Sequence, residues 1–312
     1  MPELPEVETS KRDLEFFFTG APVADIRIHD NSIRVGDPAL EIPGAGWTGA
    51  GIGRHGKTLI MEFSRLGRQK TLPPNPEKPD GEILFLLSRF GMSGSWRRIE
   101  SPSNPIHSHL EIRFSDRKAR LVWVDPRRFG RIEFTQDPRT SVLKAPTGPD
   151  ALAISPDELG SLLGTSARPL RSALMDQRLV AGIGNIYMAE ILFEARLSPF
   201  RESRTLTDRE IRALWLAMQS VLRAAIAEGG STIHSFSRED GRIGGYQRLH
   251  LVYGREGRPC PGCGLPVQRR TIEARSLYFC PFCQPAKRSA PGSAFPDSPV
   301  EGRAIRPAIF FS

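Results

Sequence analysis

The sequence begins "MPELPEVETS" (residues 1–10), and its first eight residues carry three glutamates, two prolines and no basic side chain. The chain of 312 residues is nevertheless basic, with a formal net charge of +8. Pro5 suits the first position of a helix. Apolar residues then recur on one helical face, followed by a glycine that can end the helix: Val7, Leu14, Phe18 and Gly20. The opening stretch therefore predicts a helix over residues 5–18 with an acidic, proline-stiffened start.

Short runs of β-branched and aromatic residues follow this helix. The runs are 24–30, 58–63, 82–90, 108–115, 119–125 and 130–135. Several alternate apolar with polar residues, which is typical of strands with one buried face. The longest segment between them, residues 68–81, is rich in proline and predicts an exposed loop. This half of the chain predicts a β-sandwich with a leading helix.

The composition changes at residues 135–150, which have the proline, glycine and polar content of a linker. Beyond it the apolar period becomes helical, and capping boxes are predicted at 155–158 and 207–210. The second precedes a long apolar stripe, which we interpret as core packing. Two more helices flank a glycine-rich turn at 180–185. Residues after Cys283 are rich in Pro, Ser, Ala and Gly and predict a disordered tail.

The excess of 43 Lys and Arg over 35 Asp and Glu indicates an anionic partner, most often nucleic acid, although solubility alone accounts for it equally well. No stretch reaches the roughly 18 apolar residues of a membrane-spanning helix. The start of the chain lacks the basic residues and apolar run of a signal peptide. We therefore expect a cytoplasmic protein without a membrane partner.

Four cysteines form the strongest local signal. Two Cys-x-x-Cys turns are separated by sixteen residues and consist of Cys260, Cys263, Cys280 and Cys283. Such pairs on adjacent turns complete a tetrahedron of thiolates, which favours one Zn²⁺ and leaves no open position for a substrate. A redox pair is the alternative, but two pairs at this spacing favour a structural zinc site. The intervening hairpin carries Arg269, Arg270 and Arg275, which could contact a phosphate backbone.

Two further turns combine basic, aromatic and flexible apolar residues. "DPRRFGR" (125–131) places arginines around Phe129, and "RFGMSG" (89–94) places Met92 between glycines. Proteins that wedge into a base stack use such residues. From the residues alone, a charged hairpin turn with Phe129 and Met92 packed in the core is the commoner explanation.

Pro2 raises a chemical possibility. Methionine is normally removed before a small residue, which would leave a prolyl secondary amine at the chain start. An α-amino group titrates near neutral pH, at roughly 7.7–8.0, so part of it is a free nucleophile. Attack on an aldehydic carbon would form a charged iminium, and Glu3 could carry the protons. The residues allow this chemistry without requiring it.

The motifs that identify a family occur in order along the chain. They are "MPELPEVET", "GK" (56–57), "GMSGS" (91–95), "DPRRFG", residues 174–195, "GGSTI" (229–233), "VYGREGRPC" (252–260) and the four cysteines. Together they resemble the bacterial formamidopyrimidine-DNA glycosylase family, from residue 2 to about residue 284. The resemblance implies an α+β multidomain fold. It comprises an N-terminal β-sandwich with a leading helix and a C-terminal helix–two-turn–helix domain with a four-cysteine zinc finger.

The resemblance also implies domain boundaries and partners. The expected division is a catalytic β-sandwich domain at 1–135, a linker at 136–150, a helical DNA-binding domain at 151–250, a zinc finger at 251–284 and a tail at 285–312. The partner would be damaged double-stranded DNA, bound by a monomer, with one structural Zn²⁺ as the metal. The protein would be bacterial and cytoplasmic, and associated with the nucleoid when bound to DNA.

The implied activity is that of a bifunctional glycosylase and abasic-site lyase of base excision repair. Pro2 would attack C1′ of a nucleotide with an oxidised purine, such as 8-oxoguanine or a formamidopyrimidine, and displace the base. Glu3 would shuttle protons at the sugar. Lys57 matches a proton donor and phosphate contact, and Arg275 matches an arginine that grips phosphate and assists the second elimination. The iminium would then support β- and δ-elimination.

The remaining implied residues contact DNA. Met92, Arg127 and Phe129 match residues that fill the gap left by a flipped nucleotide, and His107 and Asn185 match phosphate contacts. Arg171 stands where many members carry lysine. Residues 241–247 resemble the loop over the flipped base but contain an extra glycine.

Three alternatives remain open. An endonuclease VIII-like glycosylase uses the same nucleophile on oxidised pyrimidines, but such enzymes usually carry glycine where this chain has Leu4. A non-catalytic zinc-finger DNA-binding protein would not need Pro2, Glu3 and Lys57 together. A structural zinc-ribbon protein bound to RNA leaves the N-terminal motif unexplained.

Overall fold

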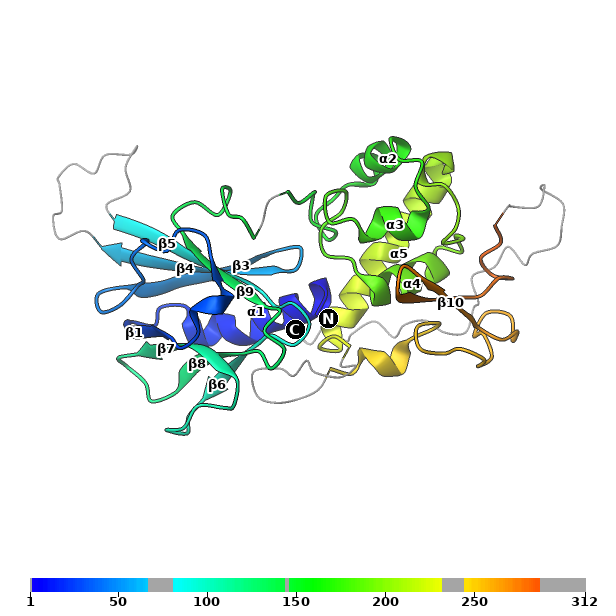
Figure 1. Cartoon of the computed structure of the whole chain (residues 1–312). Helices are drawn as coiled ribbons and strands as arrows, with labels where there is room; N and C mark the ends of the chain where they lie inside the picture. Colours follow the sequence, from blue (N-terminus) through cyan, green and yellow to red (C-terminus); the bar gives the residue numbers. More distant parts are fainter. Residues whose placement is uncertain (1, 67–80, 144–145, 232–243, 287–312) are drawn as a thin grey trace, which may run out of the picture.

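The computed structural model describes residues 2–66, 81–143, 146–231 and 244–286 (Figure 1). Residues 68–80 of the predicted loop, most of the tail and part of the segment at 241–247 therefore lie outside the described residues, whereas Gly81, the last residue predicted for the loop, begins a strand. Most strands gather on one side of the molecule and most helices on the other, and α1 (Leu4–Phe18) lies on the strand side with its first residues toward the helices. Within the described ranges, no helix has both the length and the apolar character needed to cross a membrane.

The strand-rich part is a sandwich of two sheets. One has the order β2-β9-β5-β4-β3 and the other the order β1-β7-β8-β6. Neighbouring strands are antiparallel except β2 and β9, which are parallel. The strand bounds are β1 Val23–Ile28, β2 Arg34–Val35, β3 Thr48–His55, β4 Thr58–Leu66, β5 Gly81–Arg89, β6 Ser95–Ile99, β7 Ser108–Phe114, β8 Arg120–Val124 and β9 Arg131–Thr135. The predicted β-sandwich with a leading helix is confirmed.

Three of these strands, β2, β3 and β6, were not predicted. The sequence of β3, "TGAGIGRH", contains three glycines, a residue type that is depleted in strands. Pairing with β4 along its length overrides this weak local preference.

Helix α1 contributes to two cores at once. Its later residues Val7, Leu14 and Phe18 are buried in the sandwich, where the Phe18 ring meets Phe63 edge to face at 5.1 Å. Its first residue, Leu4, instead packs in the core of the helical part, and its amide donates to the Gly182 carbonyl at 3.0 Å. The N-terminal helix therefore joins the two halves of the molecule through apolar burial at both ends.

The helical part contains four α-helices among the described residues. Their bounds are α2 Pro156–Gly164, α3 Leu170–Met175, α4 Asn185–Glu194 and α5 Asp208–Ala227, with short 3₁₀ turns at Ser203–Thr205 and Tyr246–Leu249; a third 3₁₀ turn, Asn31–Ile33, lies in the sandwich between β1 and β2. Helix α5 begins with both hydrogen bonds of the predicted capping box, between Thr207 and Glu210. At α2, the Ser155 side chain accepts a hydrogen bond from the Glu158 amide. The apolar stripe of α5 is core packing, as interpreted, with Leu214, Met218 and Leu222 fully buried.

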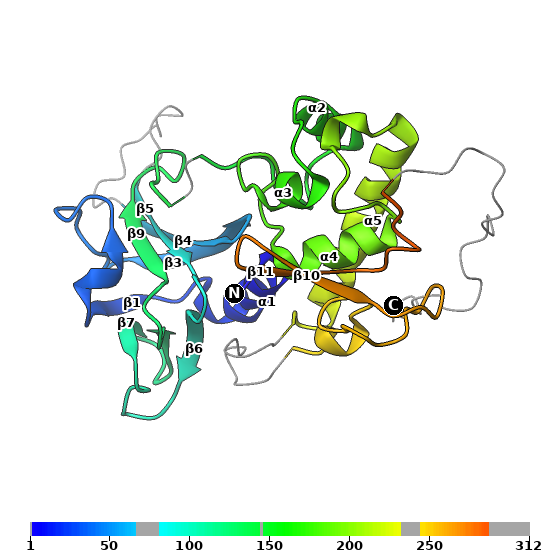
Figure 2. The same ribbon diagram turned by 45° about the vertical axis from the view of Figure 1, so that its right-hand side comes forward.

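A two-stranded hairpin follows the helices. Strands β10 (Gln268–Ile272) and β11 (Arg275–Phe279) pair antiparallel around Glu273 and Ala274. Both turn residues have positive φ, as a two-residue hairpin turn requires. Figure 2 shows this hairpin reaching from the helical side toward the start of α1.

An ion-pair network ties the sandwich to the start of the helical part. Arg54 on β3 donates to Glu8 of α1 at 2.9 Å and to Asp150 at 2.5 and 3.2 Å. Asp150 also accepts the Gly56 amide at 2.7 Å. The Arg54 side chain is only 7% exposed, so this network is largely removed from solvent screening.

We predict that Arg54→Met lowers the free energy of unfolding by about 3 kcal/mol, because two poorly hydrated carboxylates lose their partner. Arg12→Met is the matched control, because Arg12 pairs with the same Glu8 but is 60% exposed, and it should cost less than about 1 kcal/mol. Denaturant unfolding of both variants tests this. Equal losses of unfolding free energy in the two variants would show that the buried ion pairs stabilise the fold no more than the exposed one.

Candidate active site

Glu3 lies at the junction of the two halves. Its carboxylate accepts hydrogen bonds from three backbone amides at the start of α4: Gly184 at 2.7 Å, Ile186 at 3.0 Å and Tyr187 at 3.4 Å. These amides have no partner within the helix, and the helix dipole favours a negative charge there. Glu3 is 2% exposed and Pro2 before it is buried. The structure therefore places both predicted catalytic residues of the N-terminus in the interior.

Gly184 shows why the turn at 180–185 is rich in glycine. A Cβ atom added to Gly184 would lie 2.4 Å from the carboxyl carbon of Glu3. Real Cβ contacts are never this short, and the neighbour is a buried carboxylate with three hydrogen bonds. Any larger residue at 184 would therefore expel Glu3 from the helix terminus.

Glu6 forms a second buried carboxylate next to the first. One oxygen accepts the Glu3 amide at 2.8 Å, and the other accepts the Tyr187 hydroxyl at 2.6 Å and the Ser231 amide at 2.7 Å. Burial, followed by the negative charge of Glu3, raises the pKa of Glu6 to about 7, although its three donors oppose this. Glu6 therefore changes charge in the neutral range.

Lys57 approaches the same place from the tip of the β3–β4 hairpin. A Cβ atom on the preceding Gly56 would lie 2.9 Å from the Cβ of Ala181, so the tip rests against the glycine-rich turn. Burial lowers the pKa of Lys57, the charges of Glu3 and Glu6 raise it, and those of Arg275 and Arg89 lower it further. A lysine with a lowered pKa can exchange a proton more readily than an exposed one.

Arg275 of the hairpin lies close enough to Lys57 to lower its pKa. Together with Arg171 of α3 it lines a pocket of about 470 Å³. The Arg275 guanidinium is exposed and lies 3.9 Å from the Met175 sulfur, whereas Arg171 is buried and pairs with Glu273 at 3.6 Å. The pocket is also lined by Arg168, which pairs with Asp176 at 3.0 Å, so two of its three guanidinium groups already face a carboxylate.

Asn185, the first residue of α4, holds the hairpin in place. Its side-chain amide donates to the Ser276 carbonyl of β11 at 2.8 Å. This contact joins the helix that holds Glu3 to the strand that carries Arg275. The structure therefore gives Asn185 a protein contact in addition to the predicted phosphate contact.

The predicted wedge residues come together on the sandwich. Met92 is 37% exposed and Phe129 is 54% exposed, and the Arg127 guanidinium lies 5.1 Å from the centre of the Phe129 ring. A Cβ atom on Gly91, where φ is +61°, would lie 2.5 Å from the Phe129 backbone. The two turns are therefore in contact, and their apolar side chains face outward instead of joining the core. His107, also exposed, accepts the Asp125 amide with its backbone carbonyl at 3.1 Å.

Asp125 is a structural residue of these turns that the sequence analysis did not single out. It is fully buried, and its carboxylate accepts the Ser93 hydroxyl at 2.5 Å and the Gly130 amide at 2.6 Å. One side chain thus ties the Met92 turn to the Phe129 turn. The signal in the sequence was an Asp before Pro, which commonly begins a turn.

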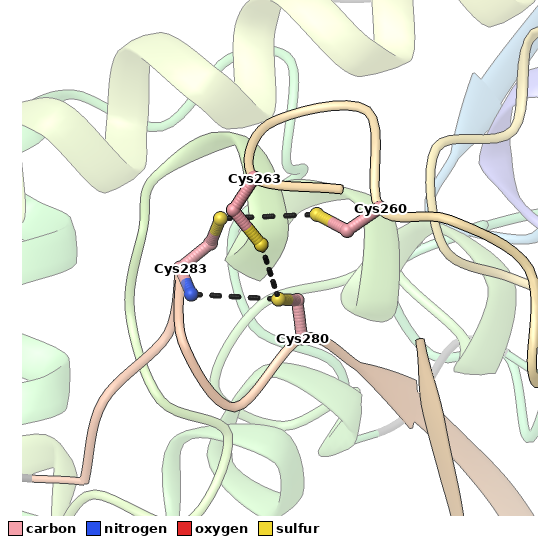
Figure 3. A group of neighbouring side chains, drawn as sticks. All are labelled: Cys260, Cys263, Cys280 and Cys283. Carbon is pink, nitrogen blue, oxygen red and sulfur yellow. Dashed lines mark hydrogen bonds between the residues drawn. The ribbon is translucent and has the colours of Figure 1, made fainter. Parts of the chain in front are cut away.

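The four cysteines converge as predicted (Figure 3). Their sulfur atoms all lie within 4.8 Å of one another, with Cys260–Cys283 at 3.8 Å and Cys263–Cys280 at 3.5 Å. These separations are far beyond the roughly 2.05 Å of a disulfide. They match the spacing of about 3.8 Å between thiolates around a tetrahedral ion with metal–sulfur bonds of about 2.3 Å. The four cysteines can therefore hold one metal ion.

Two family models match the chain. The formamidopyrimidine-DNA glycosylase N-terminal domain matches residues 1–132, and the formamidopyrimidine-DNA glycosylase H2TH domain matches residues 147–237. Formamidopyrimidine-DNA glycosylase of Thermus thermophilus is 39% identical over 290 residues, which cover 91% of this chain and 98% of that protein.

Two solved structures have a similar fold. A Lactococcus lactis Fpg mutant in complex with Fapy-dG-containing DNA is 31% identical with a TM-score of 0.76, covering 91% of this chain and all of the other. MutM in complex with carbocyclic 8-oxo-G-containing DNA is 32% identical with a TM-score of 0.75 and the same coverage.

Because Glu6 holds a proton more tightly in the folded chain than in the unfolded one, the proton stabilises the fold at low pH. This contribution is complete below about pH 4.5 and is lost as the pH rises through about 7. We predict that the free energy of unfolding of the wild type falls relative to that of Glu6→Gln by on the order of 3 kcal/mol from pH 4.5 to pH 8. Denaturant titrations across this range measure the difference, and parallel curves would contradict it.

Proposed function

The chain belongs to the formamidopyrimidine-DNA glycosylase family, and from this premise we propose that it is a DNA glycosylase and abasic-site lyase that removes oxidised purines from duplex DNA. The observation that carries the proposal is the Glu3 carboxylate, which is buried at the start of α4. Glu3 directly follows Pro2, the proposed nucleophile. A structural role alone would not need Lys57 and Arg275 beside a buried acid.

The proposed chemistry begins with removal of Met1. The Pro2 nitrogen attacks C1′ as the bond between C1′ and the damaged base breaks, and the base leaves as an anion that takes a proton from water. The Glu3 carboxylate accepts the proton released by the Pro2 nitrogen and passes it to the sugar ring oxygen, so that the ring opens and a cationic iminium remains on C1′. Loss of a C2′ proton then expels the 3′ phosphate, and a second elimination expels the 5′ phosphate. Lys57 donates a proton and contacts the phosphate, and Arg275 binds the phosphate during the second elimination.

The DNA must be distorted before this reaction begins. C1′ of a stacked nucleotide is inaccessible, and flipping the nucleotide costs a few kcal/mol. Met92, Arg127 and Phe129 are exposed together on one edge of the sandwich, and we infer that they fill the vacated space. His107, Asn185 and Arg171 would contact the phosphate backbone.

The four cysteines would hold one Zn²⁺. All-thiolate sites favour this ion, and with four protein ligands it has a structural role. Zinc would stiffen the base of the hairpin that carries Arg275. The predicted division into domains at 1–135, 151–250 and 251–284, and action in the bacterial cytoplasm, form part of the same proposal.

Oxidised purines are favoured over pyrimidines as the substrate. Complexes of similar proteins contain Fapy-dG and 8-oxo-G DNA. Leu4 and the "DPRRFG" turn also differ from the pattern of the endonuclease VIII-like alternative.

We predict that borohydride traps the untagged protein covalently on duplex DNA with 8-oxoguanine opposite cytosine, because reduction of the iminium makes the bond permanent. Mass spectrometry of the intact protein first establishes that Met1 is absent. No adduct from such protein would disprove the glycosylase and lyase proposal. Stronger trapping on thymine glycol would instead assign the chain to oxidised pyrimidines.

We also predict that Arg275→Ala weakens DNA binding and lowers the slope of log affinity against log salt by about one. Arg269→Ala on the same hairpin is the matched control, because its guanidinium already contacts Glu256 at 3.4 Å and Ser276 at 3.0 Å. Fluorescence anisotropy over a salt series measures both slopes. An unchanged slope for Arg275→Ala would contradict a phosphate contact.

A further inference from the structure

A line of hydrogen bonds leads from Glu6 away from the site to a buried histidine. The Tyr187 hydroxyl lies 2.6 Å from Glu6 and 3.2 Å from the Ser231 hydroxyl, which in turn lies 3.0 Å from Nε2 of His250. All four residues are buried, with at most 7% exposure. The proposed lyase chemistry assigns no role to Tyr187, Ser231 or His250.

The line can carry its protons in two directions. When Glu6 is ionised, Tyr187 donates to it, Ser231 donates to Tyr187 and His250 donates to Ser231. When Glu6 is protonated, each bond is reversed and Ser231 donates to Nε2 of His250. Shifting one proton along each bond converts one state into the other. The geometry therefore allows Glu6 to change its charge without contact with solvent.

The charges around Glu6 make this change useful. Glu3 faces it from α1, Lys57 from the β3–β4 hairpin and Tyr187 from α4, while Arg275 and Arg89 act on Lys57. Burial lowers the pKa of His250 to about 4, so its ring is neutral while Glu6 holds the proton. A new positive charge beside Glu6 would lower the pKa of Glu6 and bring the two groups closer to balance.

We propose that Glu6 switches its charge during the lyase reaction, neutral while Pro2 is a free amine and ionised when the cationic iminium forms, with its proton passed through Tyr187 and Ser231 to His250. The inference rests on the proposed function. The proton leaves the Glu6 carboxyl, each hydroxyl gives up one proton and receives another, and Nε2 of His250 gains one. Neutral Glu6 keeps the amine uncharged, and ionised Glu6 then offsets the charge of the iminium. Tyr187, Ser231 and His250 are thus positioning residues that act through Glu6.

The test is the rate of borohydride trapping on abasic-site duplex DNA, measured in single turnover from pH 6 to pH 8.5. His250→Phe keeps the aromatic packing against Tyr246 and Tyr253, both at 5.6 Å, but removes the proton acceptor. His250→Gln keeps a hydrogen-bonding group yet cannot take up a proton. We expect both variants to be slower by about tenfold at pH 6 and to approach the wild type at pH 8.5, where Glu6 is already ionised.

Tyr278→Phe is the matched control, since it removes a hydroxyl from a partly buried ring that packs on Tyr253 at 5.0 Å and lies outside the line of hydrogen bonds. It should retain the wild-type profile. Affinity for a tetrahydrofuran-containing duplex shows whether each variant still folds and binds. A wild-type profile for His250→Gln would overturn the inference, as would an equal loss at every pH, which indicates packing alone. Absence of trapping by the wild type would instead overturn the proposed function itself.

Discussion

The hydrogen bonds from the start of α4 to the Glu3 carboxylate are the constraint on which the rest of the structure depends. They join residue 3 to residues 184–187, and thereby the two halves of the molecule. A buried carboxylate is costly unless its oxygens are satisfied, and a helix terminus supplies both donors and a favourable dipole. Moving Glu3 would therefore leave an uncompensated acid and three unpaired amides together.

This constraint explains why a basic protein begins with acidic residues. Glu3 accepts hydrogen bonds from the first amides of α4, and Glu6 accepts them from the Ser231 amide and the Tyr187 hydroxyl, so both carboxylates face inward. Burial, and after it the negative charge of the neighbouring Glu3, raises the pKa of Glu6 to about 7. Residues 2–7 at the opening of the chain are thus all buried, and they include Glu6, whose charge changes near neutral pH.

The sequence predicts features determined by neighbours along the chain and misses those determined by distant ones. The capping box at 207–210 and the cysteine turns are local, and both were anticipated. The glycine-rich β3 was missed because its pairing with β4 outweighs its composition. Arg54 with Asp150 and Glu6 with Ser231 are 96 and 225 residues apart, so no spacing rule could pair them. The spacing of the cysteines predicted their site and the chemistry of the first residues suggested Pro2 and Glu3, whereas the other candidate site residues came from family resemblance and the hydrogen bonds around them from the structure.

Acidic side chains play one role repeatedly in this fold. Glu190 accepts hydrogen bonds from the amides of Leu251, Val252 and Tyr253. In the same way, Glu3 accepts amides at the start of α4, and Asp125 accepts the Gly130 amide in the turn that carries Phe129. Buried acids outnumber buried bases among the described residues: Glu3, Glu6, Glu111, Asp125, Glu133, Glu190 and Glu210 against Arg120 and Arg171. All of these acids except Glu111, which pairs with Arg113 and Arg120, accept backbone amides inside the protein, while most of the described arginines are not buried. It follows that the net charge of +8 understates the positive charge presented at the surface, which is the charge that a phosphate backbone would meet.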